Sequence, residues 1–190
     1  MLNPVTLNEI SDVMDWVEHR RDVLSCRLKY MKEVTEIIEI VFERVRLEKI
    51  VELLIRKLSD STLKEYNITP NSSDFNLESK EKMLNSIDQS SDGVFVFTFL
   101  DFNLKDTFLS QVWFRIDKYD NVYDLSLEIE EKELRQKTSI SNLQKRVESL
   151  AGELKTTNYY CGYEPAVDEE TRLFSGNSLG PLKDWGSVDK

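Results

Sequence analysis

Three consecutive segments between residues 93 and 130 have side chains that alternate with a period of two. They read GVFVFTFLDF, TFLSQVWFRIDKY and VYDLSLEIE. This period indicates β-strands, and the connections between the segments are too short for the crossovers that parallel strands need. The sequence therefore predicts an antiparallel β-meander, which the rest of the chain must cover.

The three segments differ in how they expose their two faces. Both sets of alternating residues are apolar in the first segment, which predicts a strand covered on both sides. In the third segment the apolar residues alternate with Asp124, Ser126, Glu128 and Glu130, which predicts one solvated face. The letters KYDN between the second and third segments predict a tight turn.

The second segment places large side chains on both faces. We expect one face to carry Phe108, Val112, Phe114 and Ile116. Trp113 projects from the other face, where it belongs either to the core or to a binding surface.

Long amphipathic helices are predicted ahead of the meander, because no proline or glycine occurs between Pro4 and Pro70. Apolar residues at steps of three and four predict helices over 6–17, 23–45 and 47–58. The last of these either continues the second helix or follows a kink.

The remaining elements are shorter. Residues 60–89 are polar and mixed, with a turn-rich connector, NITPNSSD, and a short helix over 78–87. A single apolar stripe predicts a helix over 138–155 that packs on the sheet, and NYYCGYEP predicts a short final strand. The tail from Ala166 is expected to be a loop.

These elements predict an α+β fold: long N-terminal helices, then an antiparallel β-meander with a packed C-terminal helix and a short final strand. We expect an N-terminal helical segment over 1–65 and an α+β region over 66–190. A chain of 190 residues suits one compact domain that contains both.

The charge is unevenly distributed. The net charge of the chain is −10, and residues 66–134 contribute −8 of it. Such a field disfavours direct contact with nucleic acid or an anionic membrane and favours a basic partner. The simpler interpretation is an acidic protein whose charge only prevents aggregation. Neither a leader sequence nor a membrane-length apolar run is evident, so we expect a cytoplasmic protein.

Few residues suit catalysis or metal binding. His19 is the single histidine, and Cys26 and Cys161 are the two cysteines, which we expect to be free thiols. This inventory argues against a zinc site, a Ser-His or Cys-His nucleophile, and any cofactor, so no enzymatic activity is expected. A carboxylate-dependent hydrolase that uses Glu164 and Asp168 stays open as an alternative.

The stretch from residue 158 to residue 174, NYYCGYEPAVDEETRLF, combines tyrosines with acids. Amphipathic rings and carboxylates together suit recognition of a basic protein. With the acidic face of the third strand, this stretch supplies the expected contact residues: Asp124, Glu128, Glu130, Tyr163, Glu164, Asp168, Glu169, Glu170 and Arg172. Alternatively, Glu164 and Arg172 pair within the stretch and Pro165 only ends an edge strand.

Part of this stretch resembles the C-terminal signature of bacterial immunity proteins that neutralise polymorphic secreted toxins. The positions that carry the likeness are Tyr160, Gly162, Tyr163, Glu164, Pro165, Ala166, Asp168, Thr171, Arg172 and Phe174. The resemblance implies a small, acidic, intracellular α+β protein without catalytic machinery that binds one toxin and blocks it. A basic toxin, such as a nuclease, would be attracted by the acidic field.

Two further non-enzymatic functions fit the same residues. One is a general interaction adaptor that forms a homodimer through the N-terminal helices. The other is a phage-type inhibitor whose acidic face mimics nucleic acid.

Overall fold

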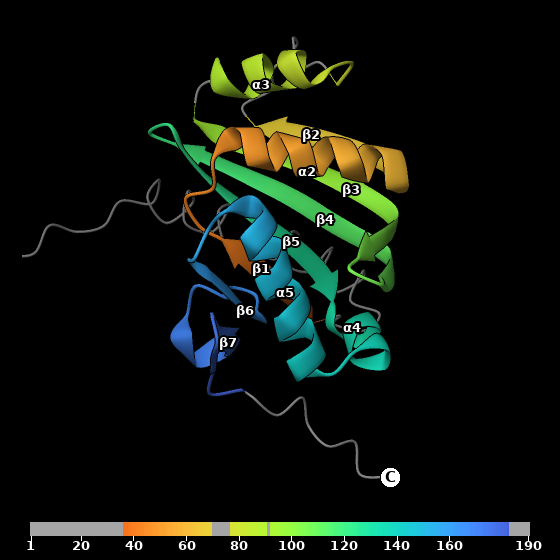
Figure 1. The fold of residues 1–190 in the computed structure, drawn as a ribbon, viewed down its shortest axis with the longest axis vertical. Helices are drawn as coiled ribbons and strands as arrows, with labels where there is room; N and C mark the ends of the chain where they lie inside the picture. Colours follow the sequence, from red (N-terminus) through yellow and green to blue (C-terminus); the bar gives the residue numbers. More distant parts are fainter. Residues whose placement is uncertain (1–35, 70–76, 91, 183–190) are drawn as a thin grey trace, which may run out of the picture. The chain divides into compact units, whose positions relative to one another are not determined.

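The predicted meander forms the centre of a larger antiparallel sheet. The computed structural model describes residues 36–69, 77–90 and 92–182. In this part of the chain, eight strands pair in the order β2-β3-β4-β5-β1-β6-β7-β8 (Figure 1). These residues all belong to one compact unit.

The three alternating segments are strands, as predicted. They are β3 (Gly93–Leu104), β4 (Thr107–Tyr119) and β5 (Val122–Glu130), and each pairs antiparallel with the next. Asp120 and Asn121, with φ of 48° and 59°, form the tight turn between β4 and β5. Left-handed values at both central residues are typical of the two-residue turn whose twist matches that of the strands.

The predicted orientation of Phe108 is wrong. Its side chain is 65% exposed, whereas Leu109 is buried. Asp101, which precedes the Leu109 partner Phe102, has a φ of 55°, and the alternation of buried side chains changes phase near it in both strands. A left-handed residue disturbs the regular pleat, so Phe102 and Leu109 turn inward and Phe108 turns outward.

The predicted long N-terminal helices are not supported. Within the segment predicted to be helical over 23–45, the residues that the structure describes contain β1 (Ile37–Phe42). This strand, IIEIVF, is rich in β-branched residues, and it pairs with β5 on one side and with β6 on the other. The helix expected over 6–17, and most of the one over 23–45, lie outside the described residues.

The helix predicted over 47–58 is confirmed as α2 (Leu47–Asp60), and the short helix over 78–87 is confirmed as α3 (Lys80–Asp88). Between them lies an edge strand that the sequence did not indicate, β2 (Thr62–Thr69), most of whose side chains are exposed. A short helix, α4 (Glu131–Lys137), follows β5 and was not predicted.

The helix predicted over 138–155 is confirmed as α5 (Ile140–Leu154). Ser139 accepts a hydrogen bond from the Asn142 N–H and so caps its N-terminus. Helices α2 and α5 cover one face of the sheet (Figure 1). The core beneath them contains fully buried aromatic residues, among them Phe97, Phe99 and Phe114, with edge-to-face ring contacts.

The C-terminal part is more regular than predicted. The expected short strand is confirmed as β6 (Tyr159–Tyr163). It is not the last strand, because the segment predicted as a loop contains a 3₁₀ turn, η1 (Glu169–Thr171), and two more strands, β7 (Arg172–Ser175) and β8 (Ser178–Leu179). Among the described residues, no helix is long and apolar enough to cross a membrane.

Helix α3 is attached to the sheet by a buried lysine. Lys118 is 5% exposed, and its Nζ donates to the carbonyl oxygens of Ile87 (3.1 Å), Asp88 (2.6 Å) and Ser90 (2.7 Å). The Tyr123 hydroxyl donates to Asp88 Oδ1 at 3.1 Å from the next strand. An ammonium group at the C-terminal end of a helix satisfies carbonyl groups that have no partner within the helix.

Replacing Lys118 with methionine is expected to destabilise the protein by about 2 kcal/mol, because the methionine keeps the apolar stem but leaves these carbonyls without their donor. Denaturant unfolding would measure the change. Lys82→Met on α3 is the control. Its exposed ion pair with Glu78 should contribute below about 0.5 kcal/mol, and equal losses in both variants would contradict the assignment.

Candidate functional site

Two of the expected contact residues, Asp124 and Glu128, lie on the face of the sheet opposite the helices, called here the second face. It carries Glu39, Val41, Trp113, Arg115, Asp124, Glu128 and Tyr160, all on alternate positions to the core residues. Beside it lies the 164–171 loop, which joins β6 to β7 and contains Glu164, Asp168, Glu169 and Glu170.

The loop is attached to β1 by a glutamate. Glu39 Oε2 accepts a hydrogen bond from the Ala166 N–H at 3.0 Å. Ala166 is fully buried and forms a small apolar cluster with Val41 and Tyr160 on the second face. One loop residue is therefore anchored by both a charge-assisted hydrogen bond and apolar packing.

Arg172 holds the loop from the other side. Its Nε donates to the Ala166 carbonyl at 3.1 Å and its Nη2 to the Val167 carbonyl at 2.9 Å, while the guanidinium lies 4.3 Å from the centre of the Tyr160 ring. The planar fork of arginine suits two such acceptors together with stacking. Arg172 thus binds the loop backbone, and the alternative pairing with Glu164 is not found among the described residues.

The remaining contacts close the loop tightly. The Thr171 hydroxyl lies within hydrogen-bond distance of the carbonyl oxygens of Pro165 (2.9 Å) and Asp168 (2.8 Å), and its single O–H is shared between them. A Cβ atom at Gly162 would lie 2.5 Å from the Thr171 carbonyl oxygen and 2.9 Å from the Arg172 Cα, so only glycine allows this approach of the two strands. Most residues that carry the family likeness therefore build the loop.

The acids of the loop point to the exterior of the protein. Glu164, Asp168, Glu169 and Glu170 are exposed. With Glu39 and Glu128 they form what we call the acidic patch. The hydrogen bonds that Glu39 and Arg172 make with the loop backbone do not involve the exposed carboxylates of the loop.

Glu128 experiences an unfavourable environment for its charge. Burial raises the pKa of Glu128, and the nearby carboxylates of Glu164 and Glu39 raise it further, although Arg115, 3.6 Å away, opposes them. Glu39 lies directly opposite Glu128 in the β1–β5 register, and like charges in that arrangement repel. An added cation from a partner would relieve this repulsion.

Other expected contact residues have partners within the protein. Asp124 accepts hydrogen bonds from the Arg44 N–H and the Tyr119 hydroxyl, both at 2.7 Å. Tyr163 packs against the helix-covered core and donates to Glu131 Oε1 at 3.2 Å, so it lies on the face opposite Glu128. Glu130 is exposed, at the end of β5 where α4 begins.

Sequence reasoning missed two residues of this site. Glu39 lies in the segment predicted to be helical over 23–45, which contains β1, so its place beside Glu128 was not visible. Arg115 lies on the same face of β4 as Trp113, and the sequence assigned it no role. It donates to Asp117 Oδ1 at 2.9 Å and lies beside Glu128. Trp113, directly opposite Glu128 in the β4–β5 register, is half-buried.

The thiol of Cys161 is unsuited to chemistry. Cys161 is free and fully buried, and burial raises the pKa of its thiol, so it is not a reactive group. Within the described residues, no group of three or more His, Cys, Asp or Glu side chains suits a metal ion. His19, Cys26 and Trp185 lie outside the described residues.

The fold and this loop have counterparts in known proteins. Residues 36–179, which include the sheet and the 164–171 loop, match the family model of the PABL017 Cdi1I immunity protein. The chain belongs to this immunity protein family. The resemblance inferred from the C-terminal stretch is thereby confirmed.

A solved structure contains a chain that is similar to this immunity protein over nearly the whole length of the solved chain. It is a chain in the 1.75 Å crystal structure of the toxic C-terminal tip of CdiA from Pseudomonas aeruginosa in complex with immune protein. The TM-score is 0.64 at 29% identity, over 78% of this chain and 99% of that chain. A Pseudomonas aeruginosa T6SS protein has a TM-score of 0.40 at 9% identity, over 74% of this chain and 49% of its own. No curated protein matches the sequence.

Gly162→Ala is expected to destabilise the immunity protein by about 2 kcal/mol, because the added methyl group would collide with the backbone of Thr171 and Arg172. Denaturant unfolding measures this. Gly152→Ala, on the exposed side of α5 with no atom nearby, should instead be neutral or stabilising. A neutral result for Gly162→Ala would show that the strands can move apart freely.

Glu128→Gln is expected to raise the melting temperature at neutral pH. Because the folded-state pKa of Glu128 lies above its ordinary value of 4.5, the ionised group opposes folding, and stability falls as the pH rises from 4.5 through the folded-state pKa. The difference between variant and wild type should therefore disappear in acid below pH 4.5. Thermal unfolding at the two pH values tests this, with exposed Glu130→Gln as control. A difference that stayed constant with pH would contradict it.

Proposed function

We propose that this protein binds and neutralises a cognate bacterial toxin. The observation that carries the proposal is the match to a chain from the crystal structure of a CdiA toxic tip in complex with immune protein, which covers 99% of that chain. Membership of an immunity protein family supports it. The protein acts by stoichiometric binding in the cytoplasm, where it covers the toxin's active site or its substrate-binding surface.

The acidic patch is the proposed contact surface. Its carboxylates pair with lysine and arginine side chains of the toxin, and charge complementarity accelerates association and selects the partner. The loop is held in place by Glu39 and Arg172 before the toxin arrives, so little conformational freedom is lost on binding. A basic toxin fits this surface, and nucleases are basic because they bind nucleic acid.

Glu128 supports the proposal through its energetics. A carboxylate kept beside Glu39 and Glu164 reduces the stability of the isolated protein, since its pKa is raised by burial and by these neighbours. Groups held in environments that oppose their charge occur most often at functional sites. A lysine or arginine of the toxin placed beside Glu128 would offset the repulsion from Glu39 and Glu164 and make the ionised form of Glu128 favourable. Half-buried Trp113, opposite Glu128, would offer its ring to the same cation.

Charge reversal on the loop tests the surface. The double variant Glu169→Lys, Glu170→Lys is expected to weaken toxin binding by about tenfold or more and to reduce its dependence on salt, because two favourable charges become repulsive. The toxin is the protein captured by this chain from the native host and encoded beside it. Surface plasmon resonance at low and high salt gives the affinity and the association rate.

The matched control is Glu81→Lys, Glu148→Lys, which makes the same change in net charge on exposed positions of α3 and α5. Equal weakening in both double variants would mean that only the net charge matters, and would reject the acidic patch while leaving toxin binding intact. Failure of the wild-type protein to bind or protect against any neighbouring toxin would reject the function itself.

A further inference from the structure

The helix-covered side of the protein carries a cavity lined by positive charge. The cavity has a volume of about 200 Å³ and lies between α2, α5 and the turn that joins β3 to β4. Three cationic side chains line it, Arg56, Lys57 and Lys105, together with Glu153 and the more exposed Asp106. This region is remote in the fold from the acidic patch, which lies on the second face.

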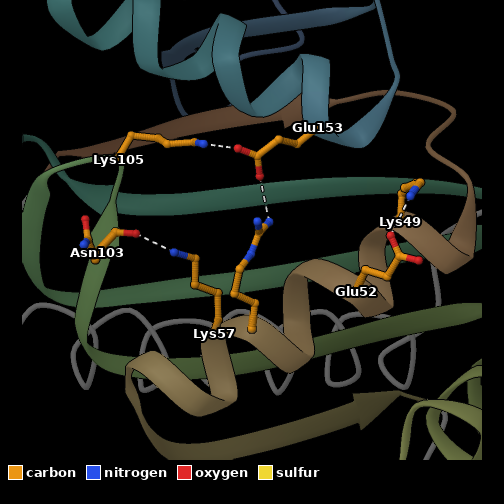
Figure 2. Close-up of polar contacts among 7 residues, drawn as sticks. Lys49, Glu52, Lys57, Asn103, Lys105 and Glu153 are labelled. Carbon is orange, nitrogen blue, oxygen red and sulfur yellow. Dashed lines mark hydrogen bonds and ion pairs between the residues drawn. The ribbon is translucent and has the colours of Figure 1, made fainter.

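One carboxylate is shared by two of the cations. Glu153, on α5, accepts from Arg56 Nη2 at 2.7 Å through one oxygen and from Lys105 Nζ through the other. Figure 2 shows Glu153 reaching from α5 toward Lys105 on the turn. Each oxygen of Glu153 thus accepts from one of these two cations, and no hydrogen bond joins Glu153 to Lys57.

Lys57 is left without an anion. Its Nζ donates to the Asn103 carbonyl at 2.5 Å (Figure 2). It also lies 4.6 Å from the centre of the Phe102 ring. In the part of the chain that the structure describes, it forms no ion pair, although it is half-buried. Burial lowers the pKa of Lys57 most, the charge of Arg56 lowers it further, Asp60 opposes them, and Lys105 adds the smallest lowering. An ammonium group has three donors, so at least one is available for an acceptor in the cavity.

The neighbouring ion pairs show the contrast. Glu52 lies more than one turn before Lys57 in α2. It accepts from Lys49 at 2.6 Å and from Lys80 at 2.8 Å, so all three of these charged residues have a partner. Three cations and two carboxylates, Glu153 and Asp106, line the cavity, and the ion pairs of Glu153 go to Arg56 and Lys105 and not to Lys57. The cavity thus combines an excess of positive charge with an unused donor.

We propose that this cavity binds one oxyanion, a phosphate or a carboxylate group, with the Lys57 ammonium as its main ligand and Lys105 and Arg56 beside it. Charge-assisted hydrogen bonds to oxyanions are short and strong, and a group of four or five heavy atoms fits the volume. The group comes either from free phosphate or from an acidic side chain of another protein. The proposal does not depend on the toxin-binding function.

The test uses the full chain and amide NMR shifts of Asn103, Lys105 and Asp106 during titration with sodium phosphate and, separately, sodium acetate, at ionic strength held constant with sodium chloride. Saturable shifts confined to this turn and to α2 are expected. Lys57→Gln should weaken binding about tenfold, because a principal charge-assisted ligand is lost. Lys49→Gln makes the same change in net charge on the same helix and should leave the affinity unchanged.

A third variant is expected to change the oxyanion affinity in the opposite direction. Glu153→Gln removes the carboxylate that competes for Arg56 and Lys105, so oxyanion binding should become tighter. Saturation by phosphate alone would support the site and identify free phosphate as its ligand, whereas saturation by acetate as well would extend the ligand to acidic side chains. Absence of saturable shifts with either anion, or equal effects of Lys57→Gln and Lys49→Gln, would overturn the proposal. Lys105→Gln serves in place of Lys57→Gln if that variant does not fold.

Discussion

The pairing of β1 with both β5 and β6 is the constraint on which the rest of this structure depends. Without β1, the meander β3-β4-β5 would end in an open edge and the strands β6-β7-β8 would be a separate small sheet. Insertion of β1 joins them into one surface with a continuous core under α2 and α5. It also brings Glu39 to the position where one side chain faces Glu128 and holds Ala166. Fold and site therefore depend on the same six residues, Ile37–Phe42.

The two sides of the sheet have different electrostatic character. On the second face, carboxylates lie close together, and the pKa of Glu128 is raised by burial and by the charges of Glu164 and Glu39. On the helix-covered side, lysine and arginine side chains surround Glu153 in excess. A net charge of −10 conceals this division, because it sums both sides.

The sequence predicted the elements whose physical pattern is local. Strands β3, β4 and β5 alternate clearly and are joined by two-residue turns, and α5 carries a single apolar stripe. It did not predict β1, because IIEIVF is apolar on both faces and its spacing also fits a helix when its partners are unknown. It did not predict β2, an edge strand with little apolar alternation. In the site, the exposed acids of the loop were identified, but Glu39 was not, since its role arises from a contact across 127 residues.

The hydrogen bonds of Arg172 end on the carbonyl oxygens of Ala166 and Val167, and those of Thr171 end on the carbonyls of Pro165 and Asp168. Every residue type offers such an oxygen. The hydrogen bonds that hold the loop therefore do not depend on the side chains at positions 167 to 170. These side chains can be replaced while the loop keeps its shape. If the loop contacts the toxin as proposed, a new set of four side chains there would change which toxin is bound without changing the rest of the protein.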